Sequence, residues 1–150
     1  MNFGDPVPDI DAETTRGERF TLSSRRGRYV VIYFFPKAFT PGCTAETKQF
    51  RDHYPELSAM GAEIVGISTD EDDVQCDFAS QLKVPFPLIA DPDGKIVGSF
   101  GVKWPLFNLA QRVTLIVDPD GKLAGYFHHE WRIAQHYNDV VAFLNKLKKS

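Results

Sequence analysis

An unbroken apolar run from Tyr29 to Phe35 constrains the fold of this 150-residue chain more than any other segment. The run is rich in β-branched and aromatic side chains, and Pro36 ends it. A strand with one solvated face would alternate between apolar and polar residues. The absence of alternation therefore predicts a central parallel strand that is buried on both faces.

Strand and helix patterns alternate along the rest of the chain. The expected elements are a helix over 41–60, a strand over 62–68, a helix opening at 70–73 and continuing to Leu82, a strand over 86–90, paired strands over 113–117 and 123–128, and a final helix over 133–147. Alternation that ends in a hairpin and a helix predicts an α/β fold with a central mixed sheet flanked by helices. The length fits one domain spanning residues 1–150.

Charge and composition exclude several classes of function. A formal net charge of −3 and an isoelectric point near 5.8 argue against nucleic acid or an anionic membrane as the main partner. No apolar run approaches the ~20 residues of a membrane helix, and residues 1–10 do not resemble a signal peptide. Two cysteines are too few for a disulfide scaffold. We therefore expect a cytoplasmic protein in which a cysteine does chemistry.

Cys43 stands where a helix is expected to begin. Thr40 occupies the N-cap and Pro41 the first helical position, so the thiol lies in the first turn. Unpaired N–H groups and the positive end of the helix dipole stabilise a thiolate there, and the thiolate is the nucleophile. A free cysteine titrates near pH ~8.5, so a thiolate at neutral pH needs about 3.4 kcal/mol of stabilisation. A helix terminus supplies at most ~2 kcal/mol of this.

A cation must supply the remainder, and Arg112 is the best candidate. It stands just before the buried strand 113–117, from which it could reach a site at one end of the sheet. Its planar fork of donors could bind a thiolate and a peroxide oxygen together. The alternative is that Cys43 is a small, buried and inert thiol, and its position in the helix does not exclude this.

The motif Pro36-x-x-x-Thr40-x-x-Cys43 resembles the active-site signature of the peroxiredoxins. The longer segment 34–46 is similar to the bacterioferritin-comigratory, or PrxQ, branch of that family. The resemblance continues through four further segments, 4–10, 66–70, 85–91 and 112–114. It implies a thioredoxin-like fold that reduces hydrogen peroxide and organic hydroperoxides without a metal or an organic cofactor.

The resemblance also implies roles for individual residues. Cys43 would be the peroxidatic cysteine and would become a sulfenic acid. Thr40 would orient the peroxide, Arg112 would stabilise charge on the thiolate and the leaving oxygen, and Pro36 would shield the thiol from water. The branch is often monomeric, so we expect a monomer or a weak homodimer.

The second cysteine departs from the family pattern. Many members of the branch carry a resolving cysteine at the position of Lys48, and others near Ala79, whereas this chain has Cys76. Helical spacing points Cys76 away from the expected buried stripe of its helix, which predicts an exposed thiol. Nearby aspartates make it a poor spontaneous nucleophile. Either Cys76 resolves Cys43 as an intramolecular disulfide, or an external thiol such as glutathione or a thioredoxin-type protein does so.

Other features are open to more than one interpretation. Trp104 lies in an apolar loop over 102–109 that could wall the peroxide pocket, form a dimer contact or simply pack in the core. Glu46 follows Cys43 by one helical turn, where it either hydrogen-bonds near the site or lies on the helix surface, and we do not expect it to be catalytic. Three histidines could suggest a metal site but are expected on the surface, and two Asp-Pro-Asp-Gly segments are expected to be turns rather than calcium loops. The histidines are His128, His129 and His136.

Two other functions compete with the peroxidase. A thiol–disulfide oxidoreductase of the thioredoxin fold would require a second cysteine at the position of Glu46. A non-enzymatic holdase would leave the joint occurrence of Thr40, Cys43 and Arg112 without a reason, and it predicts that a Cys43→Ser variant keeps its function.

Overall fold

A five-stranded mixed sheet forms the centre of the computed structural model, which describes residues 2–130 and 133–148. The strand order is β5-β4-β3-β6-β7. The strands are β3 (Tyr29–Phe34), β4 (Ala62–Ser68), β5 (Leu88–Ala90), β6 (Val113–Val117) and β7 (Leu123–His128). The central strand β3 pairs in parallel with β4 and antiparallel with β6. The predicted mixed sheet with this strand at its centre is confirmed.

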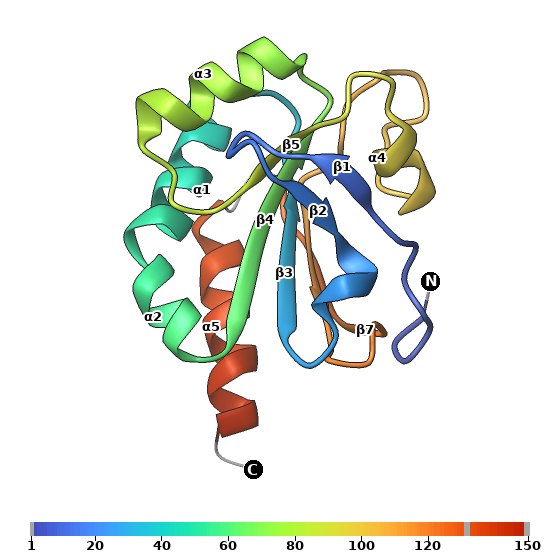
Figure 1. Ribbon diagram of the computed structural model, residues 1–150, viewed down its shortest axis with the longest axis vertical. Helices are drawn as coiled ribbons and strands as arrows, with labels where there is room; N and C mark the ends of the chain where they lie inside the picture. The colour runs from blue at the N-terminus through green and yellow to red at the C-terminus, as the bar shows by residue number, and fades with distance from the viewer. Residues whose placement is uncertain (1, 131–132, 149–150) are drawn as a thin grey trace.

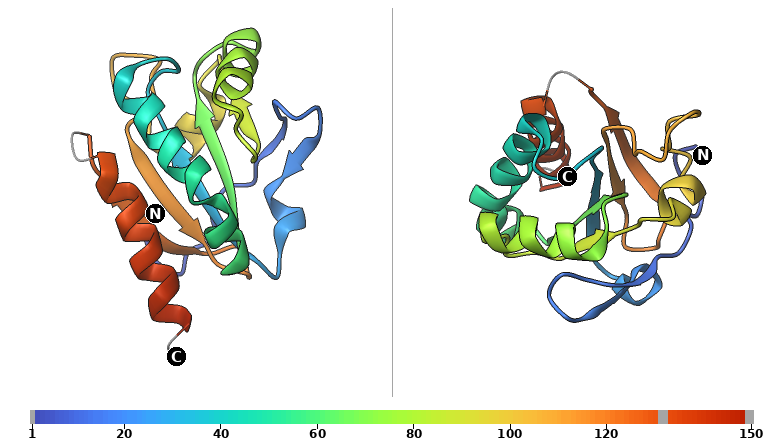
Figure 2. Two further views of the ribbon diagram at one scale, coloured as in Figure 1. Left: turned by 90° about the vertical axis from the view of Figure 1, so that its left-hand side faces the viewer. Right: turned by 90° about the horizontal axis from the view of Figure 1, so that it is seen from above.

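The helices cover both faces of the sheet (Figures 1 and 2). One face carries α1 (Pro41–Asp52), α2 (Tyr54–Ala59), α3 (Asp72–Leu82) and α5 (Ile133–Lys148). The other carries α4 (Lys95–Ser99) and a small hairpin of β1 (Asp11–Glu13) and β2 (Arg19–Thr21), which the 3-10 turn η1 (Leu22–Arg25) follows. In the described part of the chain, no helix combines the length and the apolarity that a membrane crossing requires.

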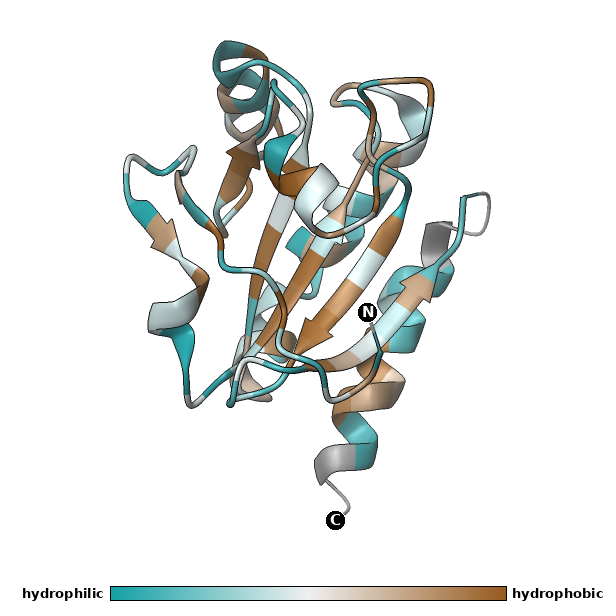
Figure 3. Cartoon of the chain, turned by 90° about the vertical axis from the view of Figure 1, so that its right-hand side faces the viewer, coloured by the Kyte–Doolittle hydropathy of each residue, from teal (hydrophilic) through white to brown (hydrophobic). Residues whose placement is uncertain are grey.

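Successive residues of β3, and Phe35 directly after it, pack into two different cores. Ile32 and Phe34 belong to the core on the α4 side of the sheet, whereas Tyr33 and Phe35 belong to the core beneath α1, α3 and α5. Because each core needs apolar side chains, the strand has no polar face, and Figure 3 shows the central strands as its most hydrophobic segments. Each large side chain buried in this way contributes roughly 1.5–3 kcal/mol.

The predicted helix over 41–60 is two helices, and in this respect the prediction was wrong. The chain leaves helical geometry at His53, where φ is −106° and ψ is 7°, and α2 begins one residue later. Pro55 explains the break, because its ring would clash with the carbonyl four residues earlier and it has no N–H to donate. The β1–β2 hairpin was not predicted, since its strands have only three residues each.

Candidate active site

The N-terminus of α1 holds Cys43 in its first turn. The N-cap Thr40 is extended, with φ −75° and ψ 151°, and its carbonyl accepts the N–H of Thr44 at 2.9 Å. The sequence suggested that the Thr40 side chain caps the helix, but it does not. The Thr40 hydroxyl instead donates to the carbonyl of Lys37 at 2.8 Å. The first-turn amides of Gly42 and Cys43 therefore receive no side-chain cap and can bind a negative charge.

The loop before α1 is held by a carboxylate that the sequence analysis missed. Asp70 Oδ2 accepts the backbone N–H of Ala38 at 2.7 Å and the hydroxyl of Ser68 at 2.7 Å. Asp70 follows the end of β4, which is hydrogen-bonded to β3, so the carboxylate lies beside the loop that leaves β3. The sequence did carry a signal for this contact. Asp70 comes shortly after a strand that is expected to pair with the strand before Cys43.

An aromatic contact joins the same loop to α3. Phe39 has a φ of +66°, a left-handed conformation that a residue other than glycine adopts only at a cost. Its ring meets Phe78 of α3 edge-on, with 5.2 Å between the ring centres. Phe78 also contacts Phe35, at 5.8 Å, in the core that contains Cys43. The packing on α3 therefore holds the loop in its strained conformation.

Arg112 reaches the sulfur of Cys43. One guanidinium nitrogen, Nη1, lies 3.5 Å from Cys43 Sγ and 3.1 Å from Glu46 Oε1. Glu130 fixes the backbone of the arginine, since its carboxylate accepts the Arg112 backbone N–H at 2.9 Å. Cys43 is fully buried and Arg112 is only 7% exposed, so the contact between them is protected from water. A short-range interaction in such a place is much stronger than on the surface.

Glu46 shares Arg112 with the cysteine, so of its two expected placements the structure has the hydrogen bond near the site and not the surface of the helix. Glu46 is 1% exposed and follows Cys43 by three residues, on the same face of α1. Burial raises the pKa of Glu46 to about 8, although Arg112 opposes this shift. Burial alone would lower the pKa of Arg112, but Cys43 and Glu46 raise it. A neutral Glu46 leaves the single positive charge of Arg112 available to a thiolate.

His136 lies behind Glu46, and the expectation that all three histidines are on the surface was wrong for this one. His136 is fully buried, whereas His128 is exposed and His129 is partly buried. Its Nε2 donates to the carbonyl of His129 at 2.9 Å, and its Nδ1 meets the hydroxyl of Thr114 at 2.7 Å. Burial lowers the pKa of His136 to about 4. The ring is therefore neutral at physiological pH and accepts from Thr114.

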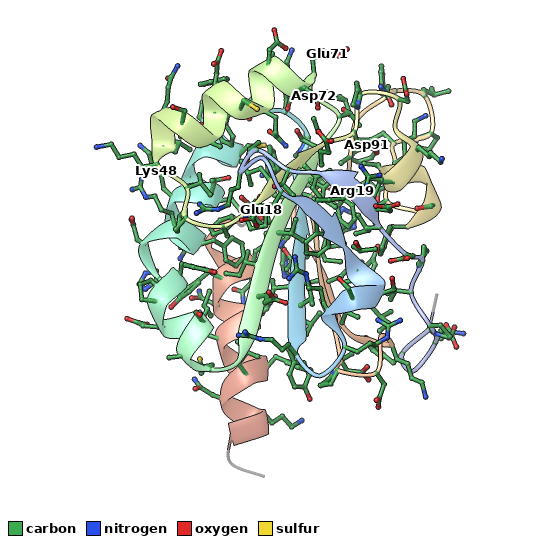
Figure 4. All side chains as sticks on the ribbon, viewed as in Figure 1. Glu18, Arg19, Lys48, Glu71, Asp72 and Asp91 are labelled. Atoms are coloured by element: carbon green, nitrogen blue, oxygen red, sulfur yellow. The ribbon has the colours of Figure 1, made fainter. Side chains whose placement is uncertain are left out.

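The structure separates Cys76 from Cys43. Cys76 is exposed, as predicted, while Phe78, two residues later, points into the core that contains Cys43. Two residues turn an α-helix by about 200°, so the two side chains occupy opposite sides of α3. Lys48, at the family's other resolving position, is an exposed side chain of α1 (Figure 4).

Pro36 and Trp104 are both half-buried. Pro36 follows β3 in the loop that precedes Cys43, the position its expected shielding role requires. Trp104 belongs to a loop whose apex is exposed, with Leu106 88% and Phe107 64% accessible to solvent. Leu106 and Phe107 therefore do not pack in the core. For the apex of the loop, this excludes core packing, one of the three interpretations given above.

The arrangement can stabilise negative charge on sulfur and on an oxygen bonded to it. A buried thiol faces a guanidinium group on one side and uncapped helix amides on the other, and both are in position before any reaction begins. Neither group needs a second cysteine nearby. This geometry suits a nucleophilic attack by sulfur better than exchange within a Cys-x-x-Cys pair.

The chain is similar to known proteins over most of its length. A sequence model of the AhpC/TSA family matches residues 3–126. Peroxiredoxin Bcp of Bacillus subtilis is 36% identical over 106 residues, which are 71% of this chain and 67% of that protein. The chloroplastic peroxiredoxin Q of Sedum lineare is 34% identical over 146 residues, 97% of this chain and 78% of that protein. With some other chloroplastic relatives, the match spans about half of the relative's length.

A solved structure agrees with these sequence matches. The crystal structure of peroxidoxin BcpB from Mycobacterium tuberculosis has a TM-score of 0.89 with this chain, at 35% sequence identity. The superposition covers 97% of each chain. The likeness therefore extends over nearly the whole chain.

Proposed function

The chain belongs to the AhpC/TSA family and is a peroxiredoxin, and on that basis we propose that Cys43 is the residue that attacks the peroxide. The function is a thiol-dependent peroxidase. The observation that carries the assignment to Cys43 is its contact with Arg112 Nη1, at 3.5 Å in a buried site. Cys76 has no comparable surroundings, because it is exposed on α3.

In the first half of the reaction, the Cys43 thiolate attacks one oxygen of the peroxide. A sulfur–oxygen bond forms, the oxygen–oxygen bond breaks, and Cys43 becomes a sulfenic acid. The departing oxygen takes up a proton and leaves as water or an alcohol. Arg112 and the amides of Gly42 and Cys43 stabilise the negative charge that moves from sulfur to this oxygen.

Thr40 and Pro36 act on the substrate and on water. The Thr40 hydroxyl already uses its proton on Lys37, so its oxygen is left to accept a hydrogen bond from the peroxide O–H. This fixes which oxygen faces the sulfur. Pro36 carries no N–H and covers one side of the loop, which keeps water from competing for the thiolate.

In the second half of the reaction, we propose that Cys76 attacks the sulfenic acid and releases water as the disulfide forms. A disulfide needs α-carbons within about 7 Å, so both helices must open locally. Two features support such opening: neither Thr40 nor Glu71 makes a side-chain cap bond at the start of its helix, and an uncapped first turn is weakly held. Thioredoxin-type protein or glutathione would then reduce the disulfide.

Intact mass spectrometry of the fully reduced protein tests both halves of this proposal. One equivalent of hydrogen peroxide is added, and the protein is then analysed without a reductant. We expect the loss of two hydrogens and a peptide that links Cys43 to Cys76. A gain of one or two oxygens on Cys43 with a free Cys76 would instead support resolution by an external thiol. A reduced Cys43 after this treatment would overturn the assignment of the nucleophile.

A further inference from the structure

Cys76 opens into two adjoining hollows between α3 and the turn of the β1–β2 hairpin. The larger has a volume of about 330 Å³ and the smaller about 200 Å³. Thr15 and Cys76 line both, so the two hollows lie on either side of these residues, and together they are called here the Cys76 groove. The volume of the larger hollow lies within the range of roughly 300–1,000 Å³ that is usual for small-molecule sites.

The two ends of the Cys76 groove have opposite charge. Arg16 and Lys83 line the larger hollow, which is therefore basic. Glu13 and Asp72 line the smaller hollow, which is acidic, and Figure 4 shows Asp72 at the start of α3. A ligand that spans the groove across Cys76 would match it with a carboxylate at one end and an ammonium at the other.

Gln75 adds a buried acceptor to the acidic end. It is fully buried, lines the smaller hollow and donates its Nε2 hydrogen to the carbonyl of Ile89 at 2.7 Å. Its Oε1 has no hydrogen-bond partner among the residues that the structure describes. A buried amide oxygen without a donor is costly. A small rotation of the Gln75 side chain would turn this oxygen toward the smaller hollow, where an ammonium or peptide N–H would satisfy it.

We propose that the Cys76 groove binds a small thiol derived from an amino acid and holds it as a mixed disulfide with Cys76. The ligand's carboxylate lies between Arg16 and Lys83, and its ammonium lies at the acidic end, where Gln75 accepts from it. The disulfide form of the ligand is the co-reactant. The Cys76 thiolate attacks one of its sulfurs, a new sulfur–sulfur bond forms, the old one breaks, and the other half leaves as a thiolate that takes up a proton.

This site does not depend on the chemistry of Cys43. The ligand's disulfide modifies Cys76 even where no peroxide is present, and the residues that bind it are separate from Cys43 and Arg112. During turnover, the same groove would bring a small reductant to the Cys76 side of a Cys43–Cys76 disulfide. That second use rests on the proposed function, whereas mixed-disulfide formation by itself does not.

A comparison of three disulfides on a Cys43→Ser variant tests the proposal, since this variant has Cys76 as its only thiol. The probes are oxidised glutathione, which carries carboxylates and ammonium groups, cystamine, which carries ammonium groups only, and dithiodipropionate, which carries carboxylates only. Intact mass gives the rate at which each modifies Cys76. Each rate is divided by the rate for the same protein unfolded in urea, which removes the probe's intrinsic reactivity.

We expect the native-to-unfolded ratio to be highest for oxidised glutathione. Arg16→Gln and Lys83→Gln should each lower that ratio by about two- to fivefold, the scale of one exposed ion pair. Arg19→Gln is the matched control, because Arg19 is an exposed cation of the same hairpin that lines neither hollow. Equal ratios for the three probes, or the highest ratio for cystamine, would overturn the proposal. Either result leaves the assignment of Cys43 untouched, because the variant lacks that thiol.

Discussion

The Nη1 atom of Arg112 lies 3.5 Å from the sulfur of Cys43, although 69 residues separate the two along the chain. The register of the sheet explains the contact. β3 and β6 are antiparallel and pair Phe34 with Val113, so the end of β3 lies beside the start of β6. Arg112 precedes that start, and the loop to Cys43 follows that end. The backbone pairing of two buried strands thus brings the cation to the thiol.

Replacement of Arg112 should slow the reaction of Cys43 with peroxide. Arg112→Met removes the positive charge, and we expect a loss of about 10²–10³-fold in the rate constant, the scale of one preorganised donor at a developing oxyanion. Arg112→Lys keeps the charge but not the planar fork, so it should recover only part of the rate. Stopped-flow measurement with hydrogen peroxide gives both values. A rate for Arg112→Met within threefold of the wild type would contradict this role.

Much of the fold and part of the site could be predicted from the sequence. The apolar run that begins at Tyr29 is buried on both faces from Val30 to Phe35, and its lack of alternation identified the central strand. The contact between Cys43 and Arg112 was predictable because one begins a helix after this strand and the other precedes a second buried strand. Both inferences depend on local patterns: a short, β-branched and aromatic apolar run that a proline ends, and two residues next to the ends of buried strands.

The residues that support the site were harder to identify. Glu46 lies on the buried face of α1 with Cys43, but a glutamate in a helix is usually solvated, and its burial depends on Arg112. His136 is buried because α5 covers a sheet face that includes Thr114, which helical spacing alone does not reveal. Asp70 acts on a loop 32 residues away in sequence. In each case a distant residue decides the environment.

The protonation of Glu46 should make stability depend on pH. Its pKa is about 8 in the folded protein and near 4.5 when unfolded, so the folded state binds more protons between these values. Stability should therefore fall as pH rises from about 5 to 8. Glu46→Gln mimics the protonated form and should remove this decline, which amounts to several kcal/mol at most. Urea denaturation at pH 5 and pH 8 measures it. A decline of equal size in the variant would show that Glu46 is not its source.

Glu46→Gln should also retain most of the peroxidase rate at pH 7. The amide oxygen can still accept from Arg112, which keeps the guanidinium beside Cys43. Glu46→Lys, in contrast, places a second cation against Arg112 in a buried site and should displace it or unfold the protein. Steady-state rates with hydrogen peroxide, together with circular dichroism, separate lost activity from lost folding. A Glu46→Gln enzyme slowed more than 100-fold would mean that its carboxyl takes part directly.

His136 should have the opposite effect on stability, in a more acidic range. Burial lowers its pKa from 6.5 to about 4, so the unfolded state binds more protons between these values. Stability should fall as pH drops from 6.5 to 4, by about 3 kcal/mol in all. His136→Gln has no such titration and should lose less stability over this range. Thermal unfolding at pH 6.5 and pH 4.5 measures the difference, and an equal loss in the variant would show that His136 is not its source.

Cys76→Ser should leave the first oxidation of Cys43 unchanged and stop turnover that depends on a dithiol reductant. In the wild type, formation of the disulfide requires the starts of α1 and α3 to open, because Cys76 lies on the side of α3 away from Cys43. Hydrogen exchange should therefore become faster over 41–46 and 72–78 after oxidation of the wild type, and not after oxidation of Cys76→Ser. Unchanged turnover in the variant would exclude Cys76 as the resolving residue.

Substitution of Gly66 should lower the stability of the folded protein, because the aromatic core beneath α1 leaves no room for a side chain there. A Cβ at this position of β4 would lie 2.6 Å from Cζ of Tyr33 and 2.7 Å from a methyl carbon of Leu88. Both side chains are fully buried, and Tyr33 is fixed by a 3.1 Å hydrogen bond to Thr47 of α1. Gly66→Ala should therefore cost about 1–3 kcal/mol.

Gly98→Ala is the matched control for this substitution. A Cβ at Gly98 meets no atom within 4 Å, and the residue is exposed in α4. There the added methyl should be neutral or should stabilise the protein by up to about 1 kcal/mol, since alanine favours a helix. Urea denaturation of the two variants compares them directly. Because Tyr33 links β4 to α1, a Gly66→Ala protein that remains folded should also react more slowly at Cys43, whereas Gly98→Ala should react at the wild-type rate. Equal stability of the two variants would contradict the prediction, because it would show that Tyr33 and Leu88 can move to accommodate the added methyl group.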